Sequence, residues 1–155
     1  MSQQAGGGGA VFFGTHVLRL DEKGRLALPS RYRDELSEGL VITKGQERCL
    51  FGYPAAYMSR IADSLAHSSA PGGSRAVREY ERFLFGSADN PTPDKAGRVV
   101  VRPELRDYAG LDRDCVVVGA NTRFEIWESA AWARFVADRE DSFSDLEAEV
   151  LPRAI

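Results

Sequence analysis

The 155-residue sequence lacks the features of several protein classes. No run of about 18 apolar residues occurs, so no transmembrane helix and no membrane partner are expected. Residues 1–10 have neither the basic flank nor the apolar centre of a secretory signal, which predicts a cytoplasmic location. Cys49 and Cys115 stand far apart in strand-like stretches, which predicts two buried free thiols rather than a disulfide or a metal pair. His16 and His67 have no partners at ligand spacing, so we expect neither a metal nor another cofactor.

The motifs of common catalytic sites are also missing. The sequence has no serine elbow, no phosphate-binding glycine loop with a lysine, and no metal-ligand cluster. The glycines at residues 6–9 form an isolated run near the terminus rather than a nucleotide loop. Carboxylates such as Asp21 and Glu22 are adjacent, so their side chains diverge and cannot flank a substrate. We therefore expect no enzyme and no small-molecule substrate.

A basic excess is absent too, because the net charge is −3. This value argues against a nucleic-acid partner, but the charge is unevenly distributed. Residues 11–60 carry eight Lys or Arg and six Asp or Glu, whereas residues 125–155 carry three and eight. Salt screens charges over about 8–10 Å. A local basic face can therefore bind a polyanion despite the acidic C-terminal region.

The sequence contains an internal repeat. The segment DEKGRLAL at residues 21–28 returns as DKAGRVVV at residues 94–101, and the register holds as far as Arg33 and Arg106. Each copy has the pattern Asp-x-x-Gly-Arg, an apolar run, a proline and a short polar helical stretch. Such a repeat predicts two similar half-units in one chain.

Local patterns predict the same order of elements in each unit. In the first unit we expect a β-hairpin with arms 17–20 and 26–28, a helix over 31–36 with Ser30 as its N-cap, strands over 40–43 and 49–53, and a helix over 54–66. In the second unit we expect a strand before the turn, then strand 99–101, helix 104–108, strands 115–119 and 124–127, and helix 129–138. A helix over 75–85 joins the units, with Val77, Tyr80, Phe83 and Leu84 on a packed face.

These elements predict an α+β fold with five segments. They are a disordered extension (1–10), a first repeat (11–66), a linker with a helix (67–90), a second repeat (91–140) and an acidic tail (141–155).

The repeated turn carries the chemistry. Gly24 and its β-rich flanks argue against a helix from Asp21 to Arg25, because glycine permits the positive φ of a hairpin tip. In such a turn Asp21 can accept backbone N–H bonds and brace an arginine of its own or of the sister repeat. The guanidinium group then projects, and it suits guanine edges or phosphate. The alternative is a buried Asp–Arg brace that only stabilises the fold.

We predict that Arg25 reads base edges and that Lys23, Arg31 and Arg33 contact phosphates. For each of the last three, a solvated charged face is an equally common use.

From residue 11 to about residue 140 the sequence resembles the MraZ family of bacterial transcriptional regulators. The matching segments are FFG at 12–14, LDEKGRL at 20–26, LPSRYR at 28–33, RFLF at 82–85, DKAGR at 94–98 and RDYAGL at 106–111. The sequence departs from the family pattern at Arg102, where the first repeat has Pro29 in the matching position, and in the ten residues that precede Val11.

This resemblance implies two internal AbrB-like repeats that form a swapped-hairpin β-barrel core with peripheral helices. It implies ring-shaped homo-oligomers that bind double-stranded DNA at tandem G-rich direct repeats upstream of the division and cell-wall gene cluster, including the protein's own promoter. It also implies association with the nucleoid. By position, the DNA-binding residues would be Asp21, Lys23, Gly24 and Arg25, with Asp94 and Arg98 as a second copy that either touches DNA or braces the first.

A ring needs apolar contact surface. The candidates are Phe12, Phe13, Tyr53, Trp127 and Trp132, although each is more often a core residue. An alternative function is a ring-forming protein-interaction scaffold that acts through the acidic C-terminal segment and has no direct DNA role.

Overall fold

The computed structural model describes residues 11–67 and 73–146. The expected N-terminal extension, most of the Ser/Gly/Pro linker and the end of the acidic tail lie outside the described residues. The elements are β1 (Thr15–Arg19), β2 (Arg25–Ala27), α1 (Ser30–Glu35), β3 (Leu40–Lys44), the short 3-10 helix η1 (Gln46–Arg48), β4 (Leu50–Pro54), α2 (Ala55–His67), α3 (Arg75–Gly86), β5 (Arg98–Val100), α4 (Pro103–Ala109), β6 (Asp114–Gly119), β7 (Phe124–Glu128) and α5 (Ser129–Ser144).

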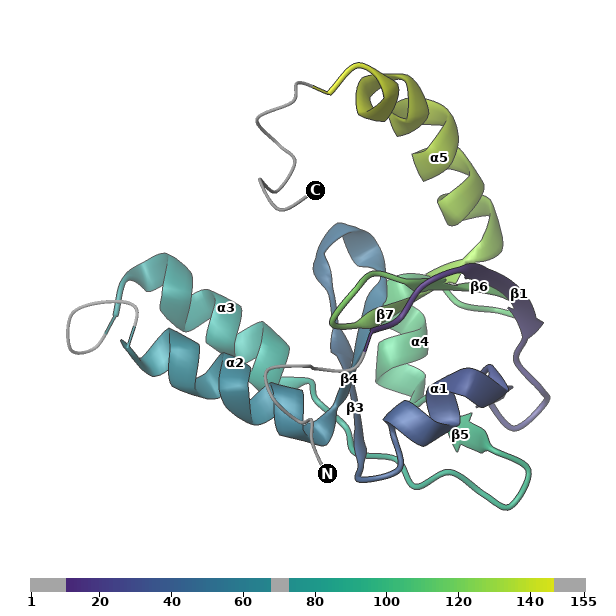
Figure 1. The fold of residues 1–155 in the computed structure, drawn as a ribbon, viewed down its shortest axis with the longest axis horizontal. Coiled ribbons are helices and arrows are strands. Elements are labelled where there is room, and N and C mark those ends of the chain that lie inside the picture. The colour runs from purple at the N-terminus through teal and green to yellow at the C-terminus, as the bar shows by residue number, and fades with distance from the viewer. Residues whose placement is uncertain (1–10, 68–72, 147–155) are drawn as a thin grey trace.

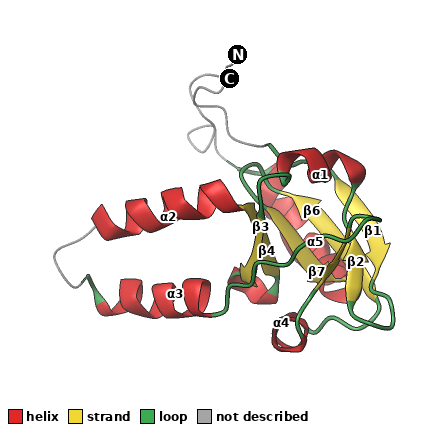
Figure 2. Cartoon of the chain, turned by 90° about the horizontal axis from the view of Figure 1, so that it is seen from below, coloured by secondary structure: helices red, strands yellow, loops and turns green. Residues whose placement is uncertain are grey.

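The two repeats are interleaved rather than placed side by side. A five-stranded antiparallel sheet has the order β1-β6-β7-β4-β3, and β2 pairs with β5 in a separate ribbon (Figures 1 and 2). Leu26 and Val99, which match in the repeat alignment, lie opposite each other in that ribbon. Phe51 and Glu125, which occupy matching places in β4 and β7, also pair. A pseudo-two-fold axis therefore passes through both pairs.

The turn at residues 21–24 forms as expected, but its arms do not pair with each other. Its tip is closed by Asp21 N donating to Arg25 O at 2.9 Å and by Gly24 N donating to Asp21 O at 3.0 Å. Beyond the tip, β1 pairs with β6 and β2 pairs with β5. Alternation in a sequence shows which face of a strand is buried but not which strand is its neighbour.

The expected closed barrel is not formed, because the described strands make two separate sheets. The strand expected before the second turn is reduced to a single bridge between Ile42 and Asp89. Pro91 and Pro93 follow, and proline has no N–H to continue a ladder. The α+β class with two repeats is confirmed, and the described strands are paired in two sheets rather than in one closed barrel.

The central strands of the large sheet are buried on both faces. Leu50, on one face of β4, packs in the same core as Leu26 and Val99 of the ribbon. Phe51 and Tyr53, on the other face, pack in a second core with side chains of α2, α3 and α5. Burial on both faces agrees with the nearly continuous apolar sequence of β4 and with the burial of Phe124 to Trp127 in β7.

Two helix details differ from the sequence analysis. Helix α1 begins at Ser30 itself, so the N-cap is Pro29 and no side chain caps the helix. In α3, Leu84 is buried, but Phe83 has 62% of its surface exposed. The expected packed face of α3 is therefore incomplete.

The aromatic residues considered for subunit contacts differ in how far they are exposed. Phe12, Tyr53 and Trp127 are buried in the two cores, Trp132 is half-buried, and Phe13 is exposed. Of these five residues, Phe13 offers the most surface to a second molecule.

Candidate nucleic-acid interface

The first turn is held by the carboxylate of Asp21. Oδ1 accepts the backbone N–H groups of Lys23 and Arg25, both at 2.9 Å, and Oδ2 accepts Nε of Arg25 at 2.7 Å. Gly24 has a φ of +73°, which the tip requires and which side chains disfavour. The backbone N–H of Arg25, more than any other group, lowers the pKa of Asp21. The aspartate therefore stays ionised and fixes the arginine at the end of a closed turn.

The second turn repeats this arrangement. Asp94 Oδ1 accepts the N–H groups of Ala96 and Arg98 at 2.9 Å, and Oδ2 accepts Nε of Arg98 at 2.8 Å. The backbone N–H of Arg98 is the main cause of a lowered pKa of Asp94. Each aspartate thus braces the arginine of its own turn rather than that of the sister repeat.

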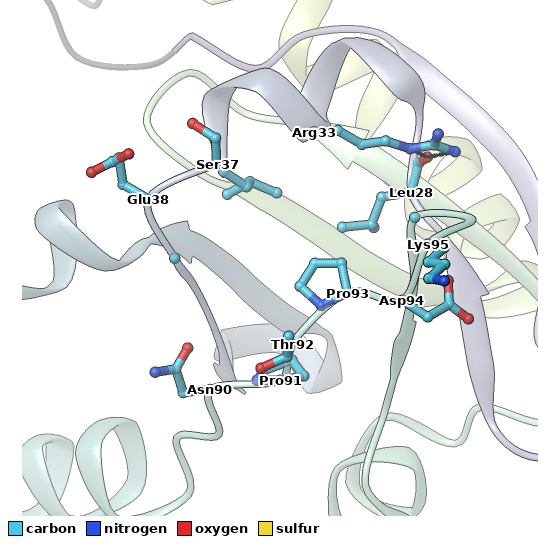
Figure 3. Close-up of a pocket in the computed structure, with 13 residues that line it drawn as sticks. Leu28, Arg33, Ser37, Glu38, Asn90, Pro91, Thr92, Pro93, Asp94 and Lys95 are labelled. Atoms are coloured by element: carbon cyan, nitrogen blue, oxygen red, sulfur yellow. Dashed lines mark hydrogen bonds between the residues drawn. The ribbon is translucent and has the colours of Figure 1, made fainter.

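Each turn is also covered by an arginine from the other repeat. A β-carbon placed on Gly24 would lie 2.9 Å from Cζ of Arg106, and one placed on Gly97 would clash with the guanidinium group of Arg33. Arg33 donates from Nε and Nη2 to the carbonyl oxygen of Leu28 at 3.3 Å, beside the second turn (Figure 3). The buried Nε of Arg106 has no hydrogen-bond partner among the described residues.

These contacts place Arg33 with the second turn, whereas the sequence grouped it with the first. Arg106 was not among the sequence-predicted site residues. Its alignment with Arg33 in the repeat was the signal that could have found it.

The β2–β5 ribbon presents both turn arginines on one face. Leu26 and Val99 are fully buried beneath the ribbon, so their neighbours in sequence point outward. Arg25 lies opposite Val100, and Ala27 lies opposite Arg98. The two arginines are therefore diagonal neighbours, which are about 7–8 Å apart in an antiparallel pair.

Neither guanidinium group projects as freely as expected. The side chain of Arg25 is 27% exposed and that of Arg98 is 39% exposed, because each lies along its own turn. Within the described residues, the hydrogen bonds of both side chains use Nε alone, which leaves their Nη atoms to face a ligand.

The remaining predicted residues are dispersed. Lys23 is exposed at the tip of the first turn. Arg31 lies on α1 with its guanidinium carbon 4.4 Å from the centre of the Phe13 ring. The structure thus groups Lys23 with Arg25 at one end of the ribbon, and Arg31 is positioned by its contact with Phe13.

The other features of the described residues do not suggest a catalytic or metal-binding site. A cavity of about 520 Å³ lies between the end of α1 and residues 90–97 (Figure 3), with two prolines and two leucines in its wall. Both cysteines are free and buried, and burial raises the pKa of the Cys115 thiol to about 11. Residues 11–67 and 73–146 contain no cluster of three His, Cys, Asp or Glu side chains suited to a metal ion. No helix in these ranges combines the length and apolarity needed to cross a bilayer.

Comparison with known protein families shows to which family the chain belongs. The family described as "MraZ protein, putative antitoxin-like" matches residues 11–78 and 84–154. The chain belongs to the MraZ family. It is 52% identical over 145 residues to a protein of Parafrankia sp. (strain EAN1pec), covering 94% of this chain and 100% of that protein. It is 55% identical over 142 residues to a protein of Thermobifida fusca, covering 92% and 98%, and 49% identical over 142 residues to one of Micrococcus luteus, covering 92% and 98%.

All three of these MraZ relatives are named "Transcriptional regulator MraZ". Membership of the MraZ family agrees with the expectation of a regulator rather than an enzyme. The family match spans both copies of the Asp-x-x-Gly-Arg turn.

Proposed function

We propose that the protein is a cytoplasmic, nucleoid-associated transcriptional regulator that binds double-stranded DNA through the outer face of the β2–β5 ribbon. The proposal is supported by membership of the MraZ family and by the names of its relatives. The observation that carries it is the diagonal placement of Arg25 and Arg98 on one outward face, each held by an aspartate.

The ribbon has the shape of a reader of the major groove, which admits a two-stranded β-ribbon. Arginines about 7–8 Å apart span roughly two base-pair steps of 3.4 Å. Each arginine can donate two hydrogen bonds to O6 and N7 of guanine. The pair therefore suits two guanines that are two base-pair steps apart, in agreement with tandem G-rich repeats as the target.

Two further arginines add to this surface. Arg106 beside the first turn and Arg33 beside the second place one more positive charge at each end of the ribbon. Lys23 at the exposed tip adds a third cation near Arg25. These side chains position the DNA through its phosphates, while Arg25 and Arg98 read bases.

A single ribbon makes too few contacts for tight binding by a chain of net charge −3. We propose that a ring of identical subunits presents several ribbons to several direct repeats. Linking binding sites raises the overall affinity by roughly 10²–10⁴ without any new contact. The regulated genes would be the division and cell-wall cluster, including the protein's own gene, as the family resemblance implies.

Selection of bound sequences from random DNA with the purified chain tests the binding class and returns the target. The selected duplex is then titrated with Arg25→Ala and with Arg60→Ala, an exposed arginine on α2, as the matched control. We expect loss of specific binding for Arg25→Ala and unchanged binding for Arg60→Ala. Equal affinity for the two variants would exclude Arg25 from the interface. A different outcome favours the scaffold function. In that case no DNA sequence is selected, and deletion of residues 141–155 abolishes the binding of other proteins.

A further inference from the structure

Helix α5 ends in an exposed apolar tip with acidic flanks. Its first turns pack on the sheet through Trp132 and Phe135, and the rest extends away from the body (Figure 1). At the far end, Phe143 is 72% exposed and Leu146 is 53% exposed. The acidic residues of this end are Asp138, Glu140, Asp141 and Asp145.

The internal repeat shows that this exposure is unusual. Helix α5 follows β7 as α2 follows β4, so the two helices hold equivalent places in their repeats. Helix α2 lies along α3 (Figure 2), and Ile61 and Tyr80 take part in the same apolar core. Within the described residues no helix lies along α5 in this way. The tip of α5 is therefore an apolar surface without a partner among residues 11–67 and 73–146.

A groove with complementary chemistry lies between α3 and the end of the β3–β4 hairpin. It encloses about 300 Å³, and its apolar wall consists of Phe51, Ala76, Tyr80, Phe83, Leu84 and Tyr108. Phe83 at its edge is 62% exposed, which is high for an aromatic side chain of the core-facing helix α3.

The mouth of the groove is positively charged. Lys44 Nζ lies 5.7 Å from the centre of the Phe83 ring and 5.2 Å from that of Tyr108. The guanidinium carbon of Arg48 lies 4.9 Å from the Tyr108 ring. Glu79 also lines the groove, but it pairs with Arg75 at 3.1 Å. The aromatic wall therefore carries two cations without a carboxylate partner among the described residues.

These walls are held in place. Arg48 donates from Nη1 to the carbonyl oxygen of Tyr108 at 3.3 Å, and the hydroxyl of Tyr108 donates to the carbonyl oxygen of Gly45. Ser87 at the end of α3 accepts the backbone N–H of Lys44 at 3.1 Å. A groove with fixed walls binds an aromatic side chain at a smaller entropic cost than a mobile one.

We propose that the tip of α5 in one subunit docks in this groove on the next subunit, with Phe143 in the aromatic wall and its acidic flank against Lys44 and Arg48. This inference rests on the proposed ring assembly and assigns its interface. Phe143 is 72% exposed, so it does not occupy the groove of its own chain, and the proposal places it in the groove of a second copy. A contact between two different surfaces is heterologous, and it generates rings when the rotation closes.

Single variants test each side of the contact by sedimentation velocity. Phe143→Ala on the tip and the pair Lys44→Glu/Arg48→Glu at the groove should each raise the subunit dissociation constant by about 30-fold or more, as an interface anchor does. Arg134→Ala on α5 and Arg60→Glu on α2 alter exposed residues outside both surfaces and should leave assembly unchanged. Because Phe143, Lys44 and Arg48 are not core residues, circular dichroism should show folded variants.

Mixing a tip variant with a groove variant distinguishes a heterologous contact from a symmetric one. A tip variant and a groove variant still share one intact tip–groove pair, so their mixture should form dimers but not rings. In addition, Asp141→Lys/Asp145→Lys should restore assembly to the chain that carries Lys44→Glu/Arg48→Glu. Oligomers that persist in both single-side variants would overturn the interface while leaving the proposed ring intact. A monomeric wild-type chain would remove the ring itself. Normal assembly with lost DNA binding in Lys44→Glu/Arg48→Glu would assign the groove to DNA instead.

Discussion

The guanidinium group of Arg106 lies against the backbone of Gly24, so close that a β-carbon on this glycine would be 2.9 Å from its Cζ. The two residues belong to different repeats and are far apart in sequence. Arg33 and Gly97 form the matching pair on the other side of the pseudo-two-fold axis. Each turn of the proposed DNA interface is therefore built by both repeats.

Gly24→Ala should weaken DNA binding through Arg106. The left-handed backbone at this position costs a side chain about 1–2 kcal/mol, and the new methyl group displaces the guanidinium group. Gly110→Ala is the control, because Gly110 has a φ of +65° but nothing within 4 Å of its β-position. Thermal denaturation should show similar losses of stability, and fluorescence anisotropy should show reduced DNA affinity for Gly24→Ala alone. Equal affinities would separate Arg106 from DNA binding.

Arg98→Ala should reduce DNA affinity to a degree similar to Arg25→Ala. Both arginines occupy the outer face of the ribbon, and a good bidentate contact to guanine contributes about 1–3 kcal/mol of discrimination. Binding to a panel of single-base variants measures this contribution. Each substitution should relax specificity at a different base position. Loss of specificity in Arg25→Ala only would restrict base reading to the first turn.

Acid should loosen the turns through Asp21 and Asp94. The pKa of each is lowered from 3.8, so the stabilisation is fully present above that value and is lost as the pH falls through the lowered folded-state pKa. The double variant Asp21→Asn/Asp94→Asn should therefore lose less stability than the wild type as the pH falls below 3.8. Melting temperatures of both proteins at a series of pH values measure the difference. Parallel curves would contradict the prediction.

Val99→Ala should destabilise the fold far more than Val100→Ala. The two residues are adjacent on β5, but Val99 is 0% exposed and Val100 is 47% exposed. Loss of a buried branched side chain costs about 2 kcal/mol from transfer and the remaining cavity, whereas surface substitutions usually stay within about 0.5 kcal/mol. Urea denaturation measures both. Similar values would show that the ribbon is not packed on the core in solution.

DNA affinity should fall steeply as salt rises. Each neutralised phosphate contributes about −0.9 to the slope of log K against log salt on duplex DNA. Arg33→Ala and Arg106→Ala should each make the slope shallower, because each removes one proposed phosphate contact, whereas Arg60→Ala should not change it. Anisotropy titrations at several salt concentrations provide the slopes. A flat dependence in the wild type would exclude phosphate contacts as the main source of affinity.

The sequence was sufficient to predict the local hydrogen bonding of the two turns. The pattern Asp-x-x-Gly-Arg predicted two closed turns with a braced arginine, because a carboxylate four residues before an arginine reaches the N–H groups of the same tight turn. The buried free thiols of Cys49 and Cys115 were predicted from their apolar, strand-like settings. All of these interactions connect residues that are close in the chain.

Only the tertiary structure decided which turn each arginine serves and how the strands pair. Arg33 lies beside Gly97, and β2 pairs with β5, because the repeats exchange strands across the pseudo-two-fold axis. The same exchange left two sheets instead of a closed barrel and placed Arg25 and Arg98 on one face. A periodic pattern specifies which side of a strand is apolar, and long-range packing alone selects the partner that covers it.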